Sequence, residues 1–563
     1  MGGARPQVSL FVGALLFMPV AVALLPEDPS TDPAVVGRWV GPFEGEVAAV
    51  NLVVLHTGEV LYWTGVEAGD RDNLFFLEGA LNAEARLFDP TTLAVTDLTD
   101  PSESHGVDLF CSGNTVLPDG RVLTAGSSQW TGLLVDGTPL HGGPESFLFD
   151  PVTRTWERAP DMAVGRWYPS LITTPEGDGL VASGIGALAN PLEHRELIER
   201  FHDHDEEVGE VDHWHAETER LLPLYPRIHV VPGGPLKGQL FYQPVGTMWG
   251  PFGEHPLEAL WNFQQVYDGN EWAMLGASKF GVRQHGAVVP LVLEPERAYA
   301  PELVTFGGSH LRSLVATPLT EIADLASAEP ENHVAHPMAF PRWHLNGVLA
   351  PDGAVYAVGG GLYDTVYLHG QPNIPVMPAE RFDPATGRWT TMAAMTVERM
   401  YHSTAVLLPD GRILAGGHVT LPIPWKDARD NVPIWEQIVE TRFEIFEPPY
   451  LHWGARPVIE NAPAQIVLDT TFVVELDDAE AISDVVLMRP GATTHAFDAD
   501  QRGIRLEVLQ VNGASDTIQL QAPPDATVAP PGYYMLFVLS EDEEGRGLIP
   551  SEAAWVRVHS TAP

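Results

Sequence analysis

Four residues that could do chemistry occupy the same place relative to a recurring turn. Cys111, Tyr168, His344 and His402 each lie eight residues before a dipeptide that ends in glycine. A thiol, a phenol and two imidazoles can ligate metals, exchange protons or carry electrons. If the turn repeats within one architecture, these side chains meet although the chain separates them. The alternative interpretation is a strand start that tolerates aromatic or small residues.

The turn belongs to a short unit in which an apolar strand follows the dipeptide and ends in glycine. Asp-Gly between two alternating apolar runs predicts a hairpin with a type I′ turn. Phe-Asp-Pro is a second mark, found at 88–90, 149–151 and 382–384 and degraded to Phe-Glu-Pro at 446–448. Copies of the turn dipeptide begin at Thr57, Asp119, Glu176, Asp352 and Asp410.

The spacing of these turns predicts a propeller. Asp119 and Glu176 are 57 residues apart and Asp352 and Asp410 are 58 apart, so residues 37–450 hold about seven units. A four-stranded unit cannot bury its faces alone, whereas a closed ring of seven sheets, a kelch-type β-propeller, buries them. Equivalent positions of successive blades then converge on the central axis. The stretch 190–310 lacks clean turn marks, and a six-bladed ring is the alternative.

The two ends of the chain differ from this repeat. Residues 451–563 show alternating strands that predict a separate immunoglobulin-like β-sandwich, so the expected fold is all-β. Residues 1–23 resemble an export signal, with Arg5, an apolar run and a small-residue cleavage site, followed by a linker at 24–36. We therefore expect a secreted or periplasmic protein, and an uncleaved membrane anchor is the alternative.

Composition excludes several classes of partner and site. Hydrophobic residues make up 45% and charged residues 19%, as in a globular protein. With 31 basic and 75 acidic residues the formal charge is 31 − 75 = −44, so we expect no nucleic-acid partner and no membrane-surface partner. Cys111 is the one cysteine, which excludes an intrachain disulfide and a multi-thiolate metal site.

Several stretches resemble the copper radical oxidases, the galactose oxidase and glyoxal oxidase group. The resemblance runs from about residue 37 to the end and keeps the family's order. It implies a thioether between Cys111 and Tyr168 and a copper ion ligated by Tyr168, Tyr401, His402 and His495. The stretches are Leu109-Phe110-Cys111, Arg166-Trp167-Tyr168-Pro169, Arg399-Met400-Tyr401-His402-Ser403, Thr493-Thr494-His495 and Pro531-Gly532-Tyr533-Tyr534-Met535.

The residue types suit the implied chemistry. Imidazoles and phenolate oxygens are good ligands for Cu(II). Alcohol oxidation by O₂ moves two electrons and copper supplies one, so a second redox centre is needed, and a phenol with an ortho sulfur is easier to oxidise. The resemblance implies that Tyr168 is the radical that abstracts hydrogen and that Tyr401 is the base. Because consecutive strand residues face opposite ways, the backbone must bend at Tyr401 and His402.

Other residues have two interpretations each. Trp167, Trp343, Arg227 and His344 are candidates for binding substrate, and ordinary blade packing is the alternative for the two tryptophans. Without the family, His495 would be interpreted as an exposed loop histidine. A cluster of histidines among acidic residues predicts a solvated insertion more than a cation site, because its spacing matches no zinc pattern; it comprises His202, His204, His213 and His215.

One stretch departs from galactose oxidase, which stacks a tryptophan over its tyrosyl-cysteine. The matching residues, 183–187, contain no aromatic side chain. We therefore expect an open site that favours small aldehydes or primary alcohols over galactose, unless Trp130 or Trp167 covers the radical from another direction.

The sequence as a whole predicts a secreted, monomeric, mononuclear copper radical oxidase that uses O₂ and releases H₂O₂. A non-catalytic kelch-type module that binds glycans or proteins at the cell surface is the alternative. Such a module would need none of the implied copper residues. A propeller hydrolase would need paired carboxylates or a Ser/His pair, and no such set stands out.

Overall fold

The structure is a computed structural model of the chain. The predicted signal segment 1–23, Trp130 and His215 lie outside the described residues, as do the side chains of His204 and His213. The structure describes residues 30–64, 84–99, 101, 106–129, 141–186, 198–204, 207–213, 220–247, 258–310, 313, 315–363, 374–417 and 439–561.

Among the described residues, seven antiparallel units of four strands form the larger part of the structure, which is the number that the turn spacing predicted. The first strands are β2 (Asn51–Val54), β6 (Gly113–Val116), β10 (Ser170–Thr173), β14 (Arg227–Val230), β20 (Ala287–Pro290), β25 (Asn346–Leu349) and β29 (Thr404–Leu407). The second strands are β3 (Val60–Trp63), β7 (Val122–Gln129), β11 (Gly179–Ala182), β15 (Leu240–Gln243), β21 (Glu302–Phe306), β26 (Val355–Val358) and β30 (Ile413–Gly416).

The outer strands complete each blade. The third strands are β4 (Ala85–Asp89), β8 (His141–Asp150), β12 (Glu199–His204), β17 (Phe263–Tyr267), β23 (Thr320–Asp324), β27 (Pro378–Asp383) and β31 (Phe443–Glu447). The fourth strands are β5 (Ala94–Leu98), β9 (Thr155–Ala159), β13 (Glu207–His213), β18 (Trp272–Ala277), β24 (Glu331–Ala335), β28 (Arg388–Ala394) and β1 (Arg38–Phe43).

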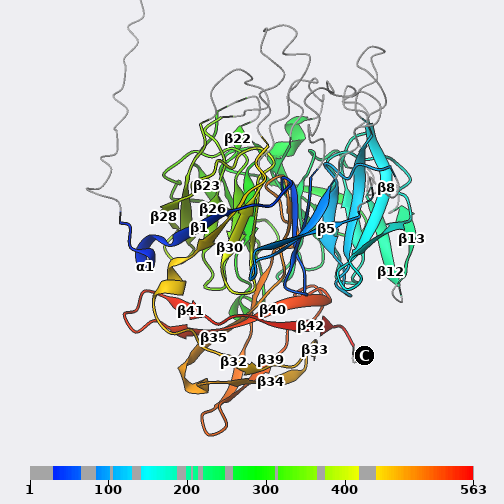
Figure 1. The fold of residues 1–563 in the computed structure, drawn as a ribbon. Coiled ribbons are helices and arrows are strands. Elements are labelled where there is room, and N and C mark those ends of the chain that lie inside the picture. The colour runs from blue at the N-terminus through cyan, green and yellow to red at the C-terminus, as the bar shows by residue number, and fades with distance from the viewer. Residues whose placement is uncertain are drawn as a thin grey trace, which may run out of the picture.

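The units are arranged as a propeller (Figure 1). The contacts between units place the first strands innermost. In most neighbouring units the first strands contact one another: β6 with β10, β10 with β14, β20 with β25, β25 with β29 and β29 with β2. Nearly all residues of the first strands are buried. Strand β1 precedes all the others in the chain but pairs with β31, so the last unit combines both ends of the propeller sequence. This pairing closes the ring.

The hairpin between the first and second strands differs from the predicted type I′ turn. Gly120 N donates to Leu117 O at 3.0 Å and Leu117 N donates to Arg121 O at 2.9 Å, which encloses a three-residue loop. Only the glycine takes a positive φ, 93° at Gly120. The type I′ prediction is wrong. A type I′ hairpin has two loop residues, both with positive φ, whereas this loop has three residues and only the third, a glycine, has positive φ.

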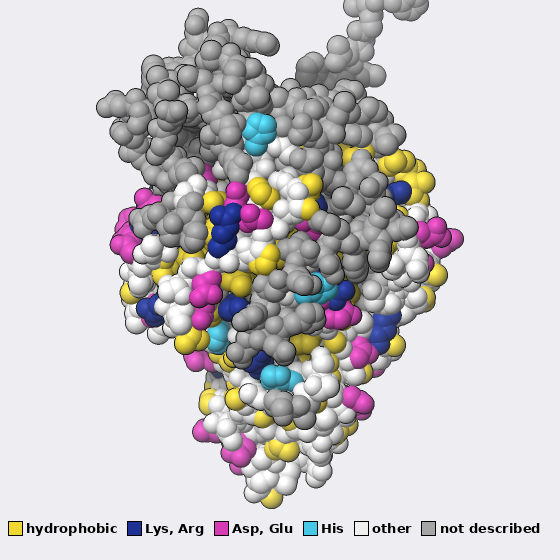
Figure 2. Space-filling view, turned by 90° about the vertical axis from the view of Figure 1, so that its right-hand side faces the viewer, with side chains coloured by type: hydrophobic (Ala, Val, Ile, Leu, Met, Phe, Trp, Pro, Cys, Tyr) yellow, Lys and Arg dark blue, Asp and Glu magenta, His cyan; other side chains and the backbone are white. Residues whose placement is uncertain are grey.

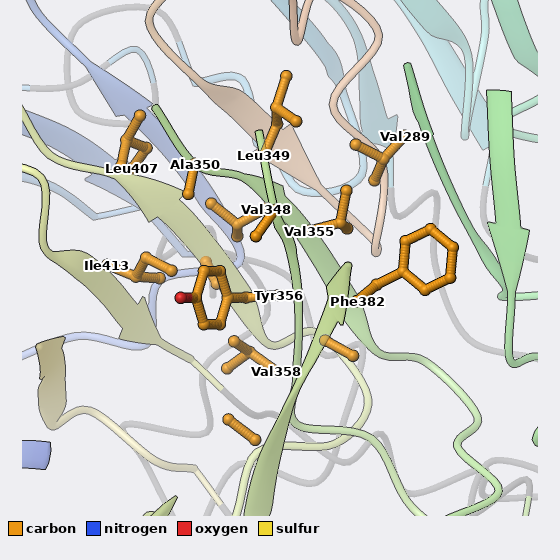
Figure 3. Close-up of a cluster of buried hydrophobic side chains, with 14 of the residues drawn as sticks. Val289, Val348, Leu349, Ala350, Val355, Tyr356, Val358, Phe382, Leu407 and Ile413 are labelled. Atoms are coloured by element: carbon orange, nitrogen blue, oxygen red, sulfur yellow. The ribbon is translucent and has the colours of Figure 1, made fainter. Parts of the chain in front are cut away.

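Apolar layers between adjacent sheets hold the blades together. Figure 3 shows one layer, in which Val348 and Val355 lie between Val289 of one neighbouring sheet and Leu407 and Ile413 of the other. Burying each such side chain contributes about 1.5–3 kcal/mol. The ring centre is therefore a fixed frame.

Residues after the propeller form the predicted two-sheet sandwich, drawn in orange and red below the ring in Figure 1. One sheet contains β32 (Ile459–Asn461), β34 (Thr471–Leu476), β39 (Thr517–Gln521) and β38 (Val508–Asn512). The other contains β33 (Gln465–Val467), β42 (Ala554–His559), β40 (Gly532–Glu541), β35 (Ile482–Met488), β37 (Gly503–Arg505) and β41 (Leu548–Pro550).

One segment of the sandwich joins the propeller. Strand β36 (Ala492–Thr494) pairs antiparallel with β2 and contacts β6, so it lies between the first two blades. We call residues 489–500 the finger. The all-β prediction is confirmed, and the finger provides the route by which the second domain reaches the ring centre.

Short elements complete the described residues. Part of the predicted linker forms helix α1 (Pro33–Val36), which lies against η5 (Pro449–His452). The others are η3 (Glu258–Asn262), η4 (Pro295–Arg297), η6 (Ala479–Ala481) and a small sheet of β16 (Val245–Gly246), β19 (Arg283–Gln284) and β22 (Ser309–His310). None of the helices in the described part of the chain has the length and apolar character needed to span a bilayer. Figure 2 shows acidic side chains scattered over one face and not gathered in a single patch.

Candidate metal centre

Each blade places one residue at the same point near the ring centre, two positions before its first strand. In six of the seven blades this residue has the left-handed backbone conformation, with φ between 43° and 67°. That conformation costs about 1–2 kcal/mol for a non-glycine residue, so the frame must impose it. The residues are Ala49, Cys111, Tyr168, Tyr225, His285, His344 and His402.

Backbone hydrogen bonds connect these positions from blade to blade. Tyr168 N donates to Cys111 O at 3.1 Å, and Tyr225 N donates to Tyr168 O at 2.9 Å. His344 N donates to His285 O at 3.1 Å in the same way. The predicted convergence of Cys111 and Tyr168 is therefore present, and Tyr225 and His285 belong to the same series.

Buried ion pairs fix the chain just before four of these positions. Each arginine lies two or three residues before the central residue and pairs with a glutamate near the third strand, and both side chains are almost fully buried. Because a buried pair needs further hydrogen bonds, each guanidinium also donates to backbone carbonyls. The pairs are Arg166–Glu199, Arg283–Glu321, Arg342–Glu380 and Arg399–Glu444.

An inserted residue allows Tyr401 and His402 to approach one point. Arg166 lies two residues before Tyr168, whereas Arg399 lies three before His402, so this blade contains one extra residue. Ser403 N donates to Met400 O at 2.9 Å, which makes the extra residue part of a turn. The Tyr401 and His402 ring centroids are 3.7 Å apart. The predicted bend is present as a tight turn before the strand.

The finger carries His495 to the ring centre. Thr494 and Phe497 exchange two backbone hydrogen bonds of 2.9 and 3.0 Å, and His495 and Ala496 form the turn between them with positive φ. Thr494 Oγ1 lies 2.7 Å from His495 Nδ1 and orients the ring. This leaves His495 Nε2 facing Cys111 Sγ, 3.7 Å away.

The structure thus brings the five residues of the predicted copper site together. Potential ligand atoms of Cys111, His402 and His495 all lie within 4.8 Å of one another. The hydroxyl oxygens of Tyr168 and Tyr401 are 2.5 Å apart. Two imidazoles, two phenols and a thiol from four separate segments converge on one buried point.

Burial keeps Cys111, Tyr168 and His495 neutral in the absence of a cation. It raises the pKa of Tyr168 well above its usual value, and Cys111 and Tyr401 raise it further. Burial likewise raises the pKa of the Cys111 thiol well above its usual value, although hydrogen bonds with Tyr168 and Trp167 lower it in part. Burial, and then the neighbouring His402 and His344, lower the pKa of His495. Neutral imidazoles are ready to bind a metal, which would itself favour deprotonated phenols.

A tryptophan covers Tyr168, contrary to the expectation of an open site. The Trp167 ring lies parallel to the Tyr168 ring, with centroids 3.6 Å apart and planes 10° apart. The 183–186 stretch that is described has no aromatic side chain, as the sequence showed. Cover by Trp167 from another direction is therefore present, and Trp130 lies outside the described residues.

The other predicted substrate residues lie in the buried interior. Trp343 is fully buried and stacks on Tyr401 at 5.6 Å and 22°. His344 is fully buried and its Nε2 accepts from His402 N at 3.4 Å. Arg227 is fully buried and donates to the carbonyls of Tyr225, Gly286, His495 and Ala496. Substrate binding by these residues stays a prediction.

Sequence reasoning missed Tyr225 and His285. The Tyr225 ring is stacked on His495 at 4.7 Å and 27° and lies 4.7 Å from the Tyr168 ring. The repeat period could have found both residues, because 57 positions separate Tyr168 from Tyr225 and 59 separate His285 from His344.

Comparison with known proteins agrees with this geometry. Residues 456–558 match the family described as "Galactose oxidase-like, Early set domain". "Aldehyde oxidase GLOX1" of Arabidopsis thaliana is 31% identical over 483 residues, which cover 80% of this chain and 71% of that protein. The chain belongs to the galactose oxidase and glyoxal oxidase family of copper radical oxidases.

Two further matches show the extent of the family likeness. A "WSC domain-containing protein" of Arthroderma benhamiae is 28% identical over 482 residues, which cover 80% of this chain; the chain spans 46% of that protein, about half its length. A solved structure titled "Novel fungal alcohol oxidase with catalytic diversity among the AA5 family, in complex with copper" has the same fold, with a TM-score of 0.71, 22% identity and coverage of 93% of this chain and 99% of that one.

The donor set fits the family's copper ion. His402 and His495 offer two imidazole nitrogens, and Tyr168 and Tyr401 offer two oxygens at the same point. This mixture of nitrogen and oxygen donors is suited to Cu(II). The fully buried Cys111 lies beside Tyr168, the pair that the sequence resemblance implies is cross-linked.

Proposed function

We propose that the protein is a copper radical oxidase that oxidises a small aldehyde or primary alcohol with O₂. An alcohol RCH₂OH and O₂ give RCHO and H₂O₂, and a hydrated aldehyde RCH(OH)₂ and O₂ give RCOOH and H₂O₂. The convergence of Cys111, Tyr168, Tyr401, His402 and His495 carries this proposal. A glycan-binding or protein-binding module would not require this set.

We also propose that Cys111 and Tyr168 form a thioether. The S–H bond of Cys111 and one ortho C–H bond of Tyr168 break, a C–S bond forms, and O₂ takes up two electrons and two protons to become H₂O₂. The two residues are joined by a backbone hydrogen bond and their side chains interact in a site without a second thiol among the described residues. An ortho sulfur makes the Tyr168 phenol easier to oxidise.

The chain's own residues then have separate tasks. Copper supplies one of the two redox equivalents when it is bound. Tyr168 holds the other and takes a hydrogen atom from the substrate carbon. Tyr401, with its oxygen 2.5 Å from that of Tyr168, accepts the hydroxyl proton. The stacked ring of Trp167 excludes water from Tyr168, which protects an oxidised phenol from side reactions.

Small substrates are favoured by the 183–186 stretch, which has no aromatic side chain to serve as a platform for a sugar ring. Trp167 covers Tyr168 from another position. The match to a plant protein named as an aldehyde oxidase supports the same substrate class.

The experiment is peroxide release from copper-loaded protein with glyoxal, methylglyoxal, glycerol, benzyl alcohol and galactose. We expect the aldehydes or simple alcohols to be oxidised faster than galactose. A clear preference for galactose would overturn the substrate class, and no peroxide with any of them would count against the proposed oxidase.

We propose in addition that the protein is exported. The support is sequence alone: Arg5, the apolar run and the Ala21-Val22-Ala23 site. Fractionation of cells that express the full chain, with N-terminal sequencing of the product, tests this. A product that keeps its first residue and stays in the cytoplasm would contradict it.

A further inference from the structure

Three segments that carry residues of the candidate copper site meet again at a single carboxylate. Asp500 lies five residues after His495, Thr115 lies four after Cys111, and Thr173 lies five after Tyr168. Thr115 and Thr173 belong to β6 and β10, the first strands of adjacent blades, and Asp500 belongs to the finger. The contact therefore joins two blades and the second domain.

The carboxylate is bonded to both strands. Asp500 Oδ1 accepts from Thr173 N at 2.9 Å, and Oδ2 accepts from Thr173 Oγ1 at 3.2 Å. Oδ2 also accepts a short hydrogen bond from Thr115 Oγ1. The two threonine hydroxyls lie 2.7 Å apart. Because the threonines are buried and the Asp500 side chain is 8% exposed, water competes weakly for these bonds.

Further contacts hold the finger in the conformation that places Asp500 beside Thr115 and Thr173. Arg489 Nη2 donates to Val116 O and to Thr173 Oγ1, each at 2.9 Å, and lies 3.9 Å from Asp500. Asp498 accepts from Ala492 N and Asp500 N, each at 3.2 Å, and so braces the base of the finger. The carboxylate is thus fixed from the finger side as well.

The hydrogen bonds of Asp500 fix the positions of the finger, β6 and β10 relative to one another. A shift of the finger along β2 would move His495, and a shift between β6 and β10 would change the separation of Cys111 and Tyr168. Asp500 opposes both movements, since either one lengthens its bonds to Thr115 or Thr173. The exposed interdomain pair Lys237–Asp525 involves none of these segments.

We propose that Asp500 is a positioning residue that sets the relative register of Cys111, Tyr168 and His495. It thereby controls formation of the thioether and the geometry of the copper site. This inference rests on the proposed function, because it assumes the cross-link. It predicts that loss of Asp500 affects the cross-link out of proportion to its effect on stability.

The test measures cross-linking in the full chain. Protein produced without copper receives Cu(II) in aerated buffer, and loss of two hydrogens from the Cys111 and Tyr168 peptides is followed by mass spectrometry. The variants are Asp500→Ala, Asp500→Asn and Thr115→Val. The matched control is Thr124→Val, a buried threonine of the same blade whose hydroxyl donates to Phe147 O, and Lys237→Ala removes an interdomain pair elsewhere.

We expect Asp500→Ala to slow cross-linking at least about 10-fold, the lower end of the range for residues that support metal ligands. Thr115→Val removes only one of the bonds to Asp500, so it should slow cross-linking less, by about 3-fold. The Cu(II) electron paramagnetic resonance (EPR) hyperfine coupling should change in both. Thr124→Val and Lys237→Ala should match the parent chain in rate and in spectrum. If Asp500→Ala does not fold, the cross-linking rate and EPR spectrum of Asp500→Asn and Thr115→Val are compared with those of the parent chain and the two controls.

The outcomes separate the two proposals. Asp500 and Thr115 variants that cross-link at the parental rate, with the parental spectrum and only a lower unfolding temperature, would overturn the positioning role. A parent chain that binds copper but never cross-links would overturn both the thioether and this inference, before any variant is compared.

Discussion

Two parts of the ring centre have the same backbone conformation but carry different side chains. Cys111, Tyr168 and His402 surround His495, whereas His285 and His344 occupy equivalent left-handed positions in adjacent blades. The His495 ring centroid is 4.6 Å from those of Tyr168 and His402 and 6.1 Å from that of His344. The repeat supplies central residues from every blade, and the finger determines which of them can share a metal.

The finger enters beside the blade with the least reactive central residue. Ala49 holds that position in the first blade, and β36 pairs with β2, the strand that follows it. A small residue there leaves room for a strand from the second domain. The blades on either side, in ring order, carry His402 and Cys111. The metal centre is therefore located by the docking of the sandwich and not by the repeat alone.

Replacement of the thiol should give the largest effect. Cys111→Ser removes the cross-link, so we expect turnover to fall by at least about 1000-fold, as for loss of a covalent catalytic group. Copper affinity should stay within about 3-fold of the parent, because two imidazoles and two phenols remain. Peroxide release and copper titration measure the two quantities. Full oxidase activity in this variant would remove Tyr168 as the radical site.

A pair of histidine variants compares the two parts of the ring directly. His495→Ala should weaken copper binding by at least about 10-fold, whereas His285→Ala should change it by less than about 3-fold. Competition with a copper chelator measures both affinities. Equal losses would mean that the metal does not distinguish the finger side of the ring from the other side.

A pair of tryptophan variants sharpens the comparison further. Trp167→Leu removes the ring stacked on Tyr168, so the oxidised form should decay about 10-fold faster once water can enter. Trp343→Leu removes the ring stacked on Tyr401 and should leave that lifetime within about 2-fold. The decay is followed by optical absorption after oxidation. A shorter lifetime for Trp343→Leu than for Trp167→Leu would reverse the assignment of the radical.

The smallest effect concerns acid stability and depends on His229, whose ring centroid lies 6.3 Å from that of Phe497 in the finger. Burial, with help from Arg502 and Arg227, lowers the pKa of His229 to about 3. Between pH 6.5 and 3 the unfolded chain binds the extra proton, so stability falls as the pH drops through this window. At pH 5 the cost is about 2 kcal/mol. His229→Gln should therefore lose less stability than the parent between pH 7 and pH 5 in thermal unfolding, and an equal loss would show that His229 is not the group responsible.

The sequence predicted one half of the ring centre better than the other. Cys111, Tyr168, His344 and His402 were found because glycine turns lie eight residues after them. Tyr225 and His285 precede blades whose first hairpins are longer, at 231–239 and 291–301, so the turn marks are absent. Arg283 lies two residues before His285, as Arg166 does before Tyr168, but this match is recognised only after the repeat length is known.

Contacts of the finger could not be predicted from any repeat. Asp500 meets Thr115 and Thr173 across 385 and 327 residues, and β36 meets β2 across more than 400. No local pattern encodes such pairs, because they depend on how the sandwich docks onto the propeller. The bend at Tyr401 was predicted, since two ligands on adjacent residues cannot both face one metal from a regular strand.

The most direct test of the account is the mass of the Cys111 and Tyr168 peptides after copper loading in air. The account predicts one linked peptide that is lighter by two hydrogens than the sum of the two, formed only when copper is present and absent in Cys111→Ser. Two separate, unmodified peptides from a copper-loaded protein that still releases peroxide would contradict it.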